Sequence, residues 1–236
     1  MRTESEPRLQ AYLGELYHAL PDVGQNPLTI RPRLHAEEAE DFLDGLEAGL
    51  FSVDCDGYVQ SPLLPPALTS RRRQEILQIF WHWRGRRVLF REGVCQLAAA
   101  SSLVLEYGWR VKNVRLEPNR GDVGAVAYGV DLAVREPSDG RILICGEVKR
   151  DTLELKKLLD DLTDCFLRGS HPRTACNRKN HPKSQFCTHT KAEHFWAVCP
   201  GIRRAFRIEF VNGVLNLRSV EDIPRNPRTA GPCLHS

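Results

Sequence analysis

The sequence contains no run of about 18 or more apolar residues, which is the length that a helix needs to cross a membrane. Its longest apolar stretch, residues 94–105, is shorter and is interrupted by Gln96, Ser101 and Ser102. The first ten residues, MRTESEPRLQ, are charged and lack the apolar segment of a secretory signal. We therefore expect a cytoplasmic protein without a membrane partner.

Internal repeats and low-complexity tracts are also missing, which excludes a solenoid or a collagen-like chain. Hydrophobic residues make up 42% of the 236 residues and the formal net charge is +3, so chain-wide disorder is excluded. The length predicts one or two domains.

Lysine is scarce, because only 7 of the 33 basic residues are lysines and the others are arginines. Arginine is the better residue for two-pronged contact with phosphate, but GC-rich codon usage produces the same preference. The charge balance permits a nucleic-acid partner without requiring one.

Residues 1–70 are predicted to form an N-terminal region of two helices and a hairpin. Apolar residues have helical spacing over residues 7–20 and 35–50, and Asp56-Gly57 separates two short alternating segments. A helix followed by a small hairpin is compatible with a winged-helix element and equally with a plain α/β cap. The proline-rich residues 61–70 indicate a linker.

A further helix is predicted over residues 71–83, with Thr69 or Ser70 as its N-cap. It contains Phe80, Trp81 and Trp83, with arginines on both sides of this aromatic group. Aromatic rings and arginines together can stack on bases and contact a phosphate backbone. The alternative is a set of core aromatics with a solvated rim of arginines.

The pattern becomes regular from residue 91 and predicts a mixed α/β fold. The expected order is a helix (91–108), three strands (109–118, 125–136 and 141–150), a helix (151–167), a strand (194–201) and a hairpin (205–220). Residues 142–145 are all apolar, which is typical of a central strand covered on both faces. Residues 223–236 contain little to bury and are predicted to form a flexible tail.

Charged residues near the ends of two neighbouring predicted strands form the candidate active site: Asp131, Glu147 and Lys149. Side chains alternate along a strand, so Glu147 and Lys149 project to one face and Val148 to the other. The turn at residues 137–140 predicts that the two strands pair antiparallel, which brings Asp131 close to Glu147.

Two carboxylates and a lysine on one sheet face predict a bound hard cation such as Mg²⁺ or Mn²⁺. A water activated by such a cation and oriented by Lys149 would be a nucleophile aimed at phosphorus. The lysine would also offer positive charge to the phosphate in the transition state.

These residues resemble the motif of the PD-(D/E)xK nuclease superfamily, which has the restriction-endonuclease-like fold. The match consists of Asp131, fifteen intervening positions and then Glu147-Val148-Lys149, while Val130 stands where the family usually has proline. The resemblance covers about half of the chain. It implies a nuclease-like core within residues 71–222 (helix, three-stranded sheet, helix, strand) and leaves the N-terminal extension unexplained. In many members an acidic residue on the first core helix joins the metal site; Glu92 is the match here, with Glu106 as the alternative.

The function implied is a metal-dependent nuclease that hydrolyses phosphodiester bonds in DNA, with RNA as the alternative substrate. Asp131, Glu147 and Glu92 would bind the metal and Lys149 would orient water. A catalytically silent nucleic-acid-binding or scaffold protein on the same fold is the competing hypothesis. Two alternatives stay open: residues 1–70 as the functional module, and an ordinary α/β domain with ion-paired surface carboxylates. A second copy of the chain, forming a homodimer, is a further candidate partner.

The eight cysteines fall into two groups. Cys55, Cys95 and Cys145 each stand among apolar residues and are predicted to be reduced and buried. The remaining five lie in the last third of the chain, where histidines are also frequent.

Within that last third, Cys176, His181, Cys187 and His189 are the tightest set, and zinc takes four sulfur or nitrogen ligands. There is no CxxC pair and the spacing matches no standard zinc finger, so a structural zinc and a solvated loop with incidental cysteines both remain open. Basic residues in the same stretch predict a DNA-facing loop: Arg168, Arg173, Arg178, Lys179, Lys183 and Lys191.

Overall fold

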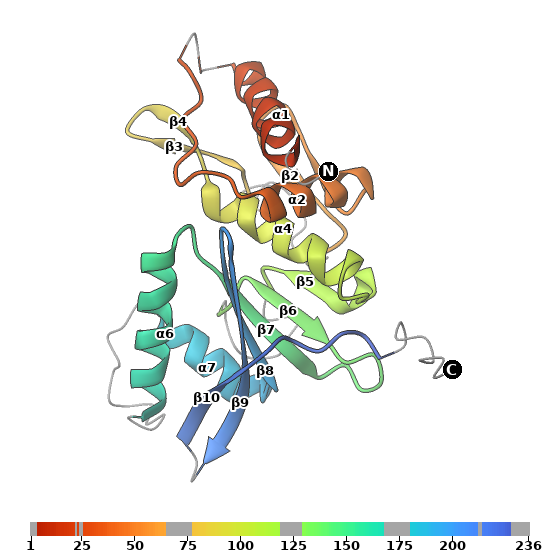
Figure 1. Cartoon of the computed structure of the whole chain (residues 1–236), viewed down its shortest axis with the longest axis vertical. Coiled ribbons are helices and arrows are strands. Elements are labelled where there is room, and N and C mark those ends of the chain that lie inside the picture. Colours follow the sequence, from red (N-terminus) through yellow and green to blue (C-terminus); the bar gives the residue numbers. More distant parts are fainter. Residues whose placement is uncertain are drawn as a thin grey trace.

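The structure is a computed structural model that describes residues 4–21, 23, 26–64, 77–118, 129–167, 180–211 and 214–227. Figure 1 shows a helical N-terminal layer at one end, a mixed sheet at the other, and the long helix α4 (Arg91–Leu105) between them. Mixed α/β is therefore confirmed as the fold class.

The N-terminal layer agrees with the sequence-based prediction. Helices α1 (Ser5–Ala19) and α2 (Ala36–Glu47) are followed by a short antiparallel pair, β1 (Ser52–Val53) and β2 (Val59–Gln60). The turn between these strands contains Gly57 with φ +84°, a left-handed conformation that favours glycine.

The prediction of a helix over residues 71–83 is wrong for residues 77–83, the part that the structure describes. Strands β3 (Phe80–Trp83) and β4 (Arg86–Leu89) form an antiparallel hairpin, and Arg84 and Gly85 both have positive φ in its two-residue turn. Phe80 and its cross-strand partner Leu89 are buried, whereas Trp81 and Trp83 are exposed. Residues 80–83 therefore have the two-residue side-chain period of a strand. The predicted N-cap at Thr69 or Ser70 lies outside the described residues.

A six-stranded sheet follows, with strand order β10-β9-β8-β7-β6-β5. Only β7 and β8 pair in parallel within this sheet, and helices α6 and α7 connect them. The predicted strand at 109–118 begins as a 3₁₀ turn (Val111–Asn113), and α7 was not predicted. The bounds are α4 (Arg91–Leu105), β5 (Val114–Leu116), β6 (Leu132–Arg135), β7 (Ile142–Val148), α6 (Thr152–Leu167), α7 (His181–Thr190), β8 (His194–Cys199), β9 (Ile202–Val211) and β10 (Val214–Val220).

Two hydrophobic clusters cover the sheet. On β8, Trp196 and Val198 join the cluster that contains α4 and the N-terminal helices, whereas Phe195 and Ala197 join the cluster that contains α6 and α7. Every residue of β7 is buried, as the apolar run 142–145 predicted for a central strand. Glu147 lies in this strand, so the fold places a carboxylate inside the protein.

The N-terminal layer shares one hydrophobic cluster with α4 and the sheet. A buried ion pair reinforces this contact, because Arg91 Nη1 and Nη2 each donate to a Glu38 carboxylate oxygen at 2.7 Å. Arg91 Nε also donates to the carbonyl of Pro32 at 2.9 Å. Buried residues of the N-terminal layer therefore pack in the same cluster as α4 and one face of the sheet.

The tail predicted to be flexible from residue 223 is packed at its start. Ile223 and Asn226 are buried, and the Asn226 amide Nδ2 donates to the Gly108 carbonyl at 2.9 Å. The aromatic rings of Tyr107 and Trp109 supply the surface that this segment covers, and Trp109 Nε1 donates to the Pro224 carbonyl. Residues 228–236 lie outside the described residues.

We expect Gly45→Ala to lower the free energy of unfolding by about 1–3 kcal/mol because it overpacks the contact between α2 and α4. A Cβ on Gly45 would lie 1.8 Å from Ser101 Oγ and 2.9 Å from Phe51 Cε1. Urea unfolding followed by circular dichroism measures the change. The matched control is Gly14→Ala in α1, where no described atom lies within 4 Å of the added Cβ, so stability should rise by about 0.5–1 kcal/mol. Equal effects of the two variants would contradict the close approach.

Candidate active site

The structure brings the four predicted site residues together at one end of the sheet. Glu92 lies in the first turn of α4, Asp131 directly precedes β6, Glu147 lies in β7, and Lys149 follows β7. One carboxylate oxygen each from Glu92, Asp131 and Glu147 lies within 4.8 Å of the others. These residues line a pocket of about 280 Å³ together with Glu154, Lys157, Asn180 and Lys183.

Asp131 is fixed by backbone hydrogen bonds at the point where β6 meets β7. Its Oδ2 accepts the Val148 N–H at 2.7 Å, and its own N–H donates to the Gly146 carbonyl at 3.0 Å. Gln96, one helical turn after Glu92, donates to the Asp131 carbonyl at 3.0 Å and to Glu117 Oε1 at 2.9 Å. The contact between α4 and the sheet therefore sets the position of the first carboxylate.

Lys149 joins the two other carboxylates. Its Nζ lies 2.9 Å from Glu92 Oε1 and 2.6 Å from Glu147 Oε1, and it donates to the Val148 carbonyl at 2.6 Å. Burial lowers the pKa of Lys149, but the negative charges of Glu147, Asp131 and Glu92 outweigh burial, and the pKa is raised above its ordinary value. Lys149 is therefore a positively charged donor at neutral pH.

Lys183 is a second cation of the pocket and was not predicted as a site residue. It lies in α7, and its Nζ is 2.9 Å from the same Glu147 Oε1 that contacts Lys149. The sequence marked it only as part of a basic stretch, since α7 was not predicted. Gln96 and Glu117 were missed as well; the spacing of four residues between Glu92 and Gln96 on one helix is a signal that could have found Gln96.

Three carboxyl groups in or beside the pocket have raised pKa values: those of Asp131, Glu147 and the neighbouring Glu117. Burial, followed by the charge of Glu147, raises the pKa of Asp131 to about 8, and Lys149 opposes this only in part. Burial and the neighbouring Asp131 raise the pKa of Glu117 to about 8. Burial also raises the pKa of Glu147, against the lowering effect of Lys149 and Lys183. Without a further cation, the site therefore has too little positive charge to ionise all its acids near neutral pH.

These residues fit a hard divalent cation. Three carboxylates converge, and Glu147 Oε2 is buried without a hydrogen-bond partner among the described residues. A buried carboxylate oxygen without a hydrogen-bond partner lowers the stability of the folded protein. Mg²⁺ and Mn²⁺ prefer carboxylate oxygens as ligands, so a bound cation would satisfy this oxygen.

A site that binds Mg²⁺ through these carboxylates is expected to give a stabilisation by the metal that grows between pH 6 and pH 9. Because the pKa of Asp131 and of Glu117 is raised in the folded protein, their contribution to stability is complete at low pH and is lost as the pH rises through about 8. Metal binds the ionised carboxylates, so affinity increases over the same range. Thermal melting with Mg²⁺ and with EDTA at each pH measures the effect, and Asp131→Asn is the control that should weaken it. A melting shift that is independent of pH would contradict the expectation.

The alternative acid of α4 lies outside the pocket. Glu106 Oε2 lies 3.1 Å from Arg203 Nη1, and its Oε1 lies 3.3 Å from Arg225 Nη2, at the other end of the helix. Between the two candidates on α4, Glu92 is the one that the structure places with Asp131 and Glu147.

The predicted zinc set is not brought together in its described part. Cys187 is buried with its Sγ 3.3 Å from Cys145 Sγ, whereas His189 is exposed near the end of α7. Among the described residues, His181 at the start of α7 forms no group of three potential ligands with Cys187 and His189, and Cys176 lies outside the described residues. Zinc binding by this stretch stays a prediction.

The predicted burial of three cysteines is confirmed for two of them. Cys95 and Cys145 are buried, but Cys55 is exposed, because it lies in the turn between β1 and β2. Of the basic residues predicted to face DNA, Lys183 lies in the acidic pocket and Lys191 ends α7; the others, Arg168, Arg173, Arg178 and Lys179, lie outside the described residues.

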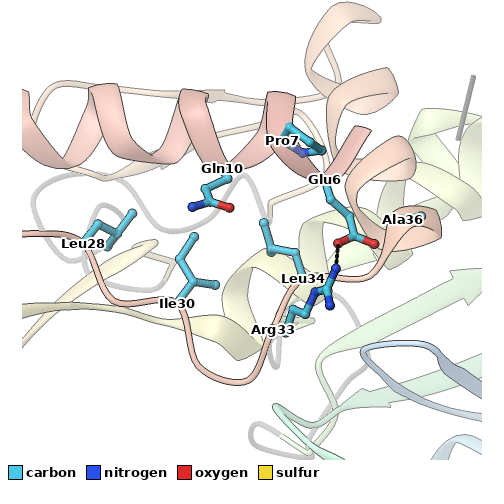
Figure 2. Close-up of a pocket in the computed structure, with 8 residues that line it drawn as sticks. All are labelled: Glu6, Pro7, Gln10, Leu28, Ile30, Arg33, Leu34 and Ala36. Atoms are coloured by element: carbon cyan, nitrogen blue, oxygen red, sulfur yellow. Dashed lines mark hydrogen bonds and ion pairs between the residues drawn. The ribbon is translucent and has the colours of Figure 1, made fainter. Parts of the chain in front are cut away.

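A larger pocket of about 540 Å³ lies in the N-terminal layer (Figure 2). Leu28, Ile30 and Leu34 line it from the segment between α1 and α2, and its charged groups, Glu6 and Arg33, pair with each other at 3.2 Å. It contains no converging acids among its lining residues. The chemistry of the described residues therefore favours the smaller pocket.

The fold and this pocket define a mixed α/β protein with a partly buried acidic cluster. Comparison of the chain with protein-family models, with curated proteins and with solved structures finds no match. Within the described residues, no helix is long and apolar enough to cross a membrane.

Proposed function

We propose that the protein is a metal-dependent nuclease of the PD-(D/E)xK type, with a restriction-endonuclease-like core, that hydrolyses phosphodiester bonds in DNA. The observation that carries the proposal is the convergence of Glu92, Asp131 and Glu147 within 4.8 Å, with the Lys149 ammonium between two of them. The resemblance to this superfamily implies the same four residues, carried in the same order by a helix and two strands.

The metal would be held by Asp131, Glu147 and Glu92. When bound, Mg²⁺ or Mn²⁺ supplies Lewis-acid polarisation of phosphate oxygens and lowers the pKa of water. The Val148 N–H donates to Asp131 Oδ2 and so fixes the orientation of the carboxylate that would hold the metal.

The lysines contribute positive charge rather than a base. Lys149 is protonated at neutral pH, so it can orient a water through hydrogen bonds and stabilise negative charge on the phosphate, but it cannot accept a proton from the water. Lys183 and Lys157 line the same pocket and add attraction for a phosphodiester backbone. The pocket therefore combines acids for a cation with cations for an anionic substrate.

A catalytically silent nucleic-acid-binding or scaffold protein is the second candidate. The observation that favours it is the pairing of one Glu147 oxygen with two ammonium groups, Lys149 at 2.6 Å and Lys183 at 2.9 Å, which neutralises this carboxylate without a metal.

Incubation with supercoiled, linear and single-stranded DNA, and with RNA, in Mg²⁺, Mn²⁺ or EDTA tests the proposal. We expect cleavage of DNA that depends on the metal and is lost in Asp131→Asn. Asp139→Asn is the matched control, because Asp139 is exposed in the turn between β6 and β7 and pairs only with the neighbouring Arg141 in the described contacts. Binding without cleavage by the wild-type protein would favour the silent alternative, and cleavage by Asp131→Asn would exclude this site.

A further inference from the structure

The β3–β4 hairpin presents a group of exposed apolar side chains on one face. Trp81, Trp83 and Val88 are 46%, 63% and 39% exposed. Trp81 and Trp83 are two residues apart on one strand, and Val88 is the cross-strand partner of Trp81, so all three side chains project to the same face. Such a concentration of exposed apolar area marks an interaction surface.

The Trp81 indole is held in a fixed plane. Its ring stacks on Phe90 with centroids 3.9 Å apart and an interplanar angle of 12°. Phe90 is the residue that precedes the first turn of α4, so the stack is supported by the helix terminus. Since nearly half of the Trp81 side chain is accessible, a further flat ring can extend the stack without a conformational change.

The charge of the hairpin is of one sign. The sequence FWHWRGRRVLF at residues 80–90 contains three arginines and no acidic residue. Arg86 is the cross-strand partner of Trp83 and lies on the same face, and the Arg84 guanidinium lies 5.8 Å from the centre of the Trp83 ring. Aromatic faces bordered by arginines are complementary to a partner that alternates flat bases with phosphates.

The hairpin projects from the body of the protein beside the beginning of α4 (Figure 1). β4 ends at Leu89, and the pocket residue Glu92 follows three positions later. A strand bound on the hairpin can therefore continue toward the acidic pocket.

We infer that the β3–β4 hairpin binds single-stranded nucleic acid, with bases stacked on Trp81 and Trp83 and phosphates contacted by Arg84 and Arg86. Binding itself needs no catalysis. Delivery of the strand to the pocket, by contrast, rests on the proposed nuclease function.

The test measures binding of labelled oligothymidylate, oligouridylate and a duplex of the same length by anisotropy in EDTA. Trp83→Ala and Trp81→Ala should each weaken single-strand binding by about tenfold, as expected for the loss of one base–aromatic stack. Arg84→Asn with Arg86→Gln should weaken binding and reduce the dependence on salt, because phosphate contacts are lost; asparagine at residue 84 tolerates the positive φ of +49°.

Intrinsic fluorescence gives an independent measurement. Trp109 and Trp196 are fully buried, so quenching by the oligonucleotide reports on the two hairpin tryptophans. The matched controls are Val211→Ala, which removes an exposed apolar side chain at the end of β9, and Arg218→Ala, which removes an exposed charge on β10. Both should bind like the wild type, and thermal melting checks that each variant is folded.

Unchanged affinity of folded Trp83→Ala, or equal affinity for duplex and single strand, would overturn the inference. Self-association that is lost in Trp83→Ala, without nucleic-acid binding, would identify the hairpin as a homodimer contact instead. Single-strand binding in EDTA with no cleavage in Mg²⁺ would uphold the hairpin and reject the nuclease. Cleavage that is insensitive to the hairpin variants would uphold the nuclease and reject delivery of the strand by the hairpin.

Discussion

Under the proposed nuclease function, replacing Lys149 with alanine is expected to reduce the rate of DNA cleavage by about 10² to 10⁴-fold, the range seen when one positioned proton donor or charge-stabilising group is removed. Lys149 has the ammonium group that lies between Glu92 and Glu147, and its raised pKa keeps the positive charge in place. Binding of substrate should change far less than the rate, because Lys183 and Lys157 still line the pocket. Single-turnover cleavage with saturating enzyme measures the chemical step separately from binding.

Lys156→Ala is the matched control for this prediction, since Lys156 is exposed on α6 and does not line the pocket. Lys149→Arg keeps the charge but not the size of the group, and we expect it to recover stability without full activity. Removal of the lysine also leaves two carboxylates without their partner, so melting temperatures must accompany the rates. A folded Lys149→Ala protein that cleaves at the wild-type rate would contradict the assigned role.

Glu38→Ala is expected to lower the free energy of unfolding by about 3–5 kcal/mol, the cost of leaving a buried charge unpaired. Arg91 and Glu38 are almost completely buried, and Arg91 Nη1 and Nη2 each lie 2.7 Å from a different carboxylate oxygen. The loss should appear in chemical unfolding, and cleavage should fall too, because Arg91 directly precedes Glu92 in the first turn of α4.

The exposed ion pair between Arg8 and Glu47 provides the comparison. It joins α1 to the end of α2 at 2.9 Å, yet both side chains are more than half exposed, so Glu47→Ala should cost only about 0–1 kcal/mol. Replacing both buried partners, with Glu38→Leu and Arg91→Met together, should recover most of the stability lost in Glu38→Ala. Equal costs for Glu38→Ala and Glu47→Ala would show that burial does not decide the strength of these pairs.

The candidate site could be predicted from the sequence because its residues follow local rules. Strand alternation and a tight turn place Asp131 beside Glu147 and Lys149, and the helix start at Glu92 follows from the regular apolar spacing of α4. Lys183 could not be predicted in the same way. It reaches Glu147 from a helix far along the chain, and α7 has no pronounced apolar face that would reveal it in the sequence.

Errors in the fold arose where tertiary contacts decided the outcome. Residues 80–83 were expected to be helical, but the burial of Phe80 and Leu89 on one face and the turn at Arg84 and Gly85 select a hairpin. The start of the tail was expected to be free, yet Asn226 is held by the Gly108 carbonyl. Contacts of this kind join residues distant in sequence, so short-range patterns carry no signal for them.

The parallel pairing of β7 with β8 sets the order in which the site can be completed. Glu147 lies at the end of β7, but Lys183 is delivered by the connection that leads to β8. Along the chain, Glu92, Asp131, Glu147 and Lys149 all precede α7 (His181–Thr190), so they are synthesised first. A chain that ends before α7 therefore has the three acids and the lysine of the motif but lacks Lys183. The positive charge of Lys183 is added to the site only when α7 packs beside it.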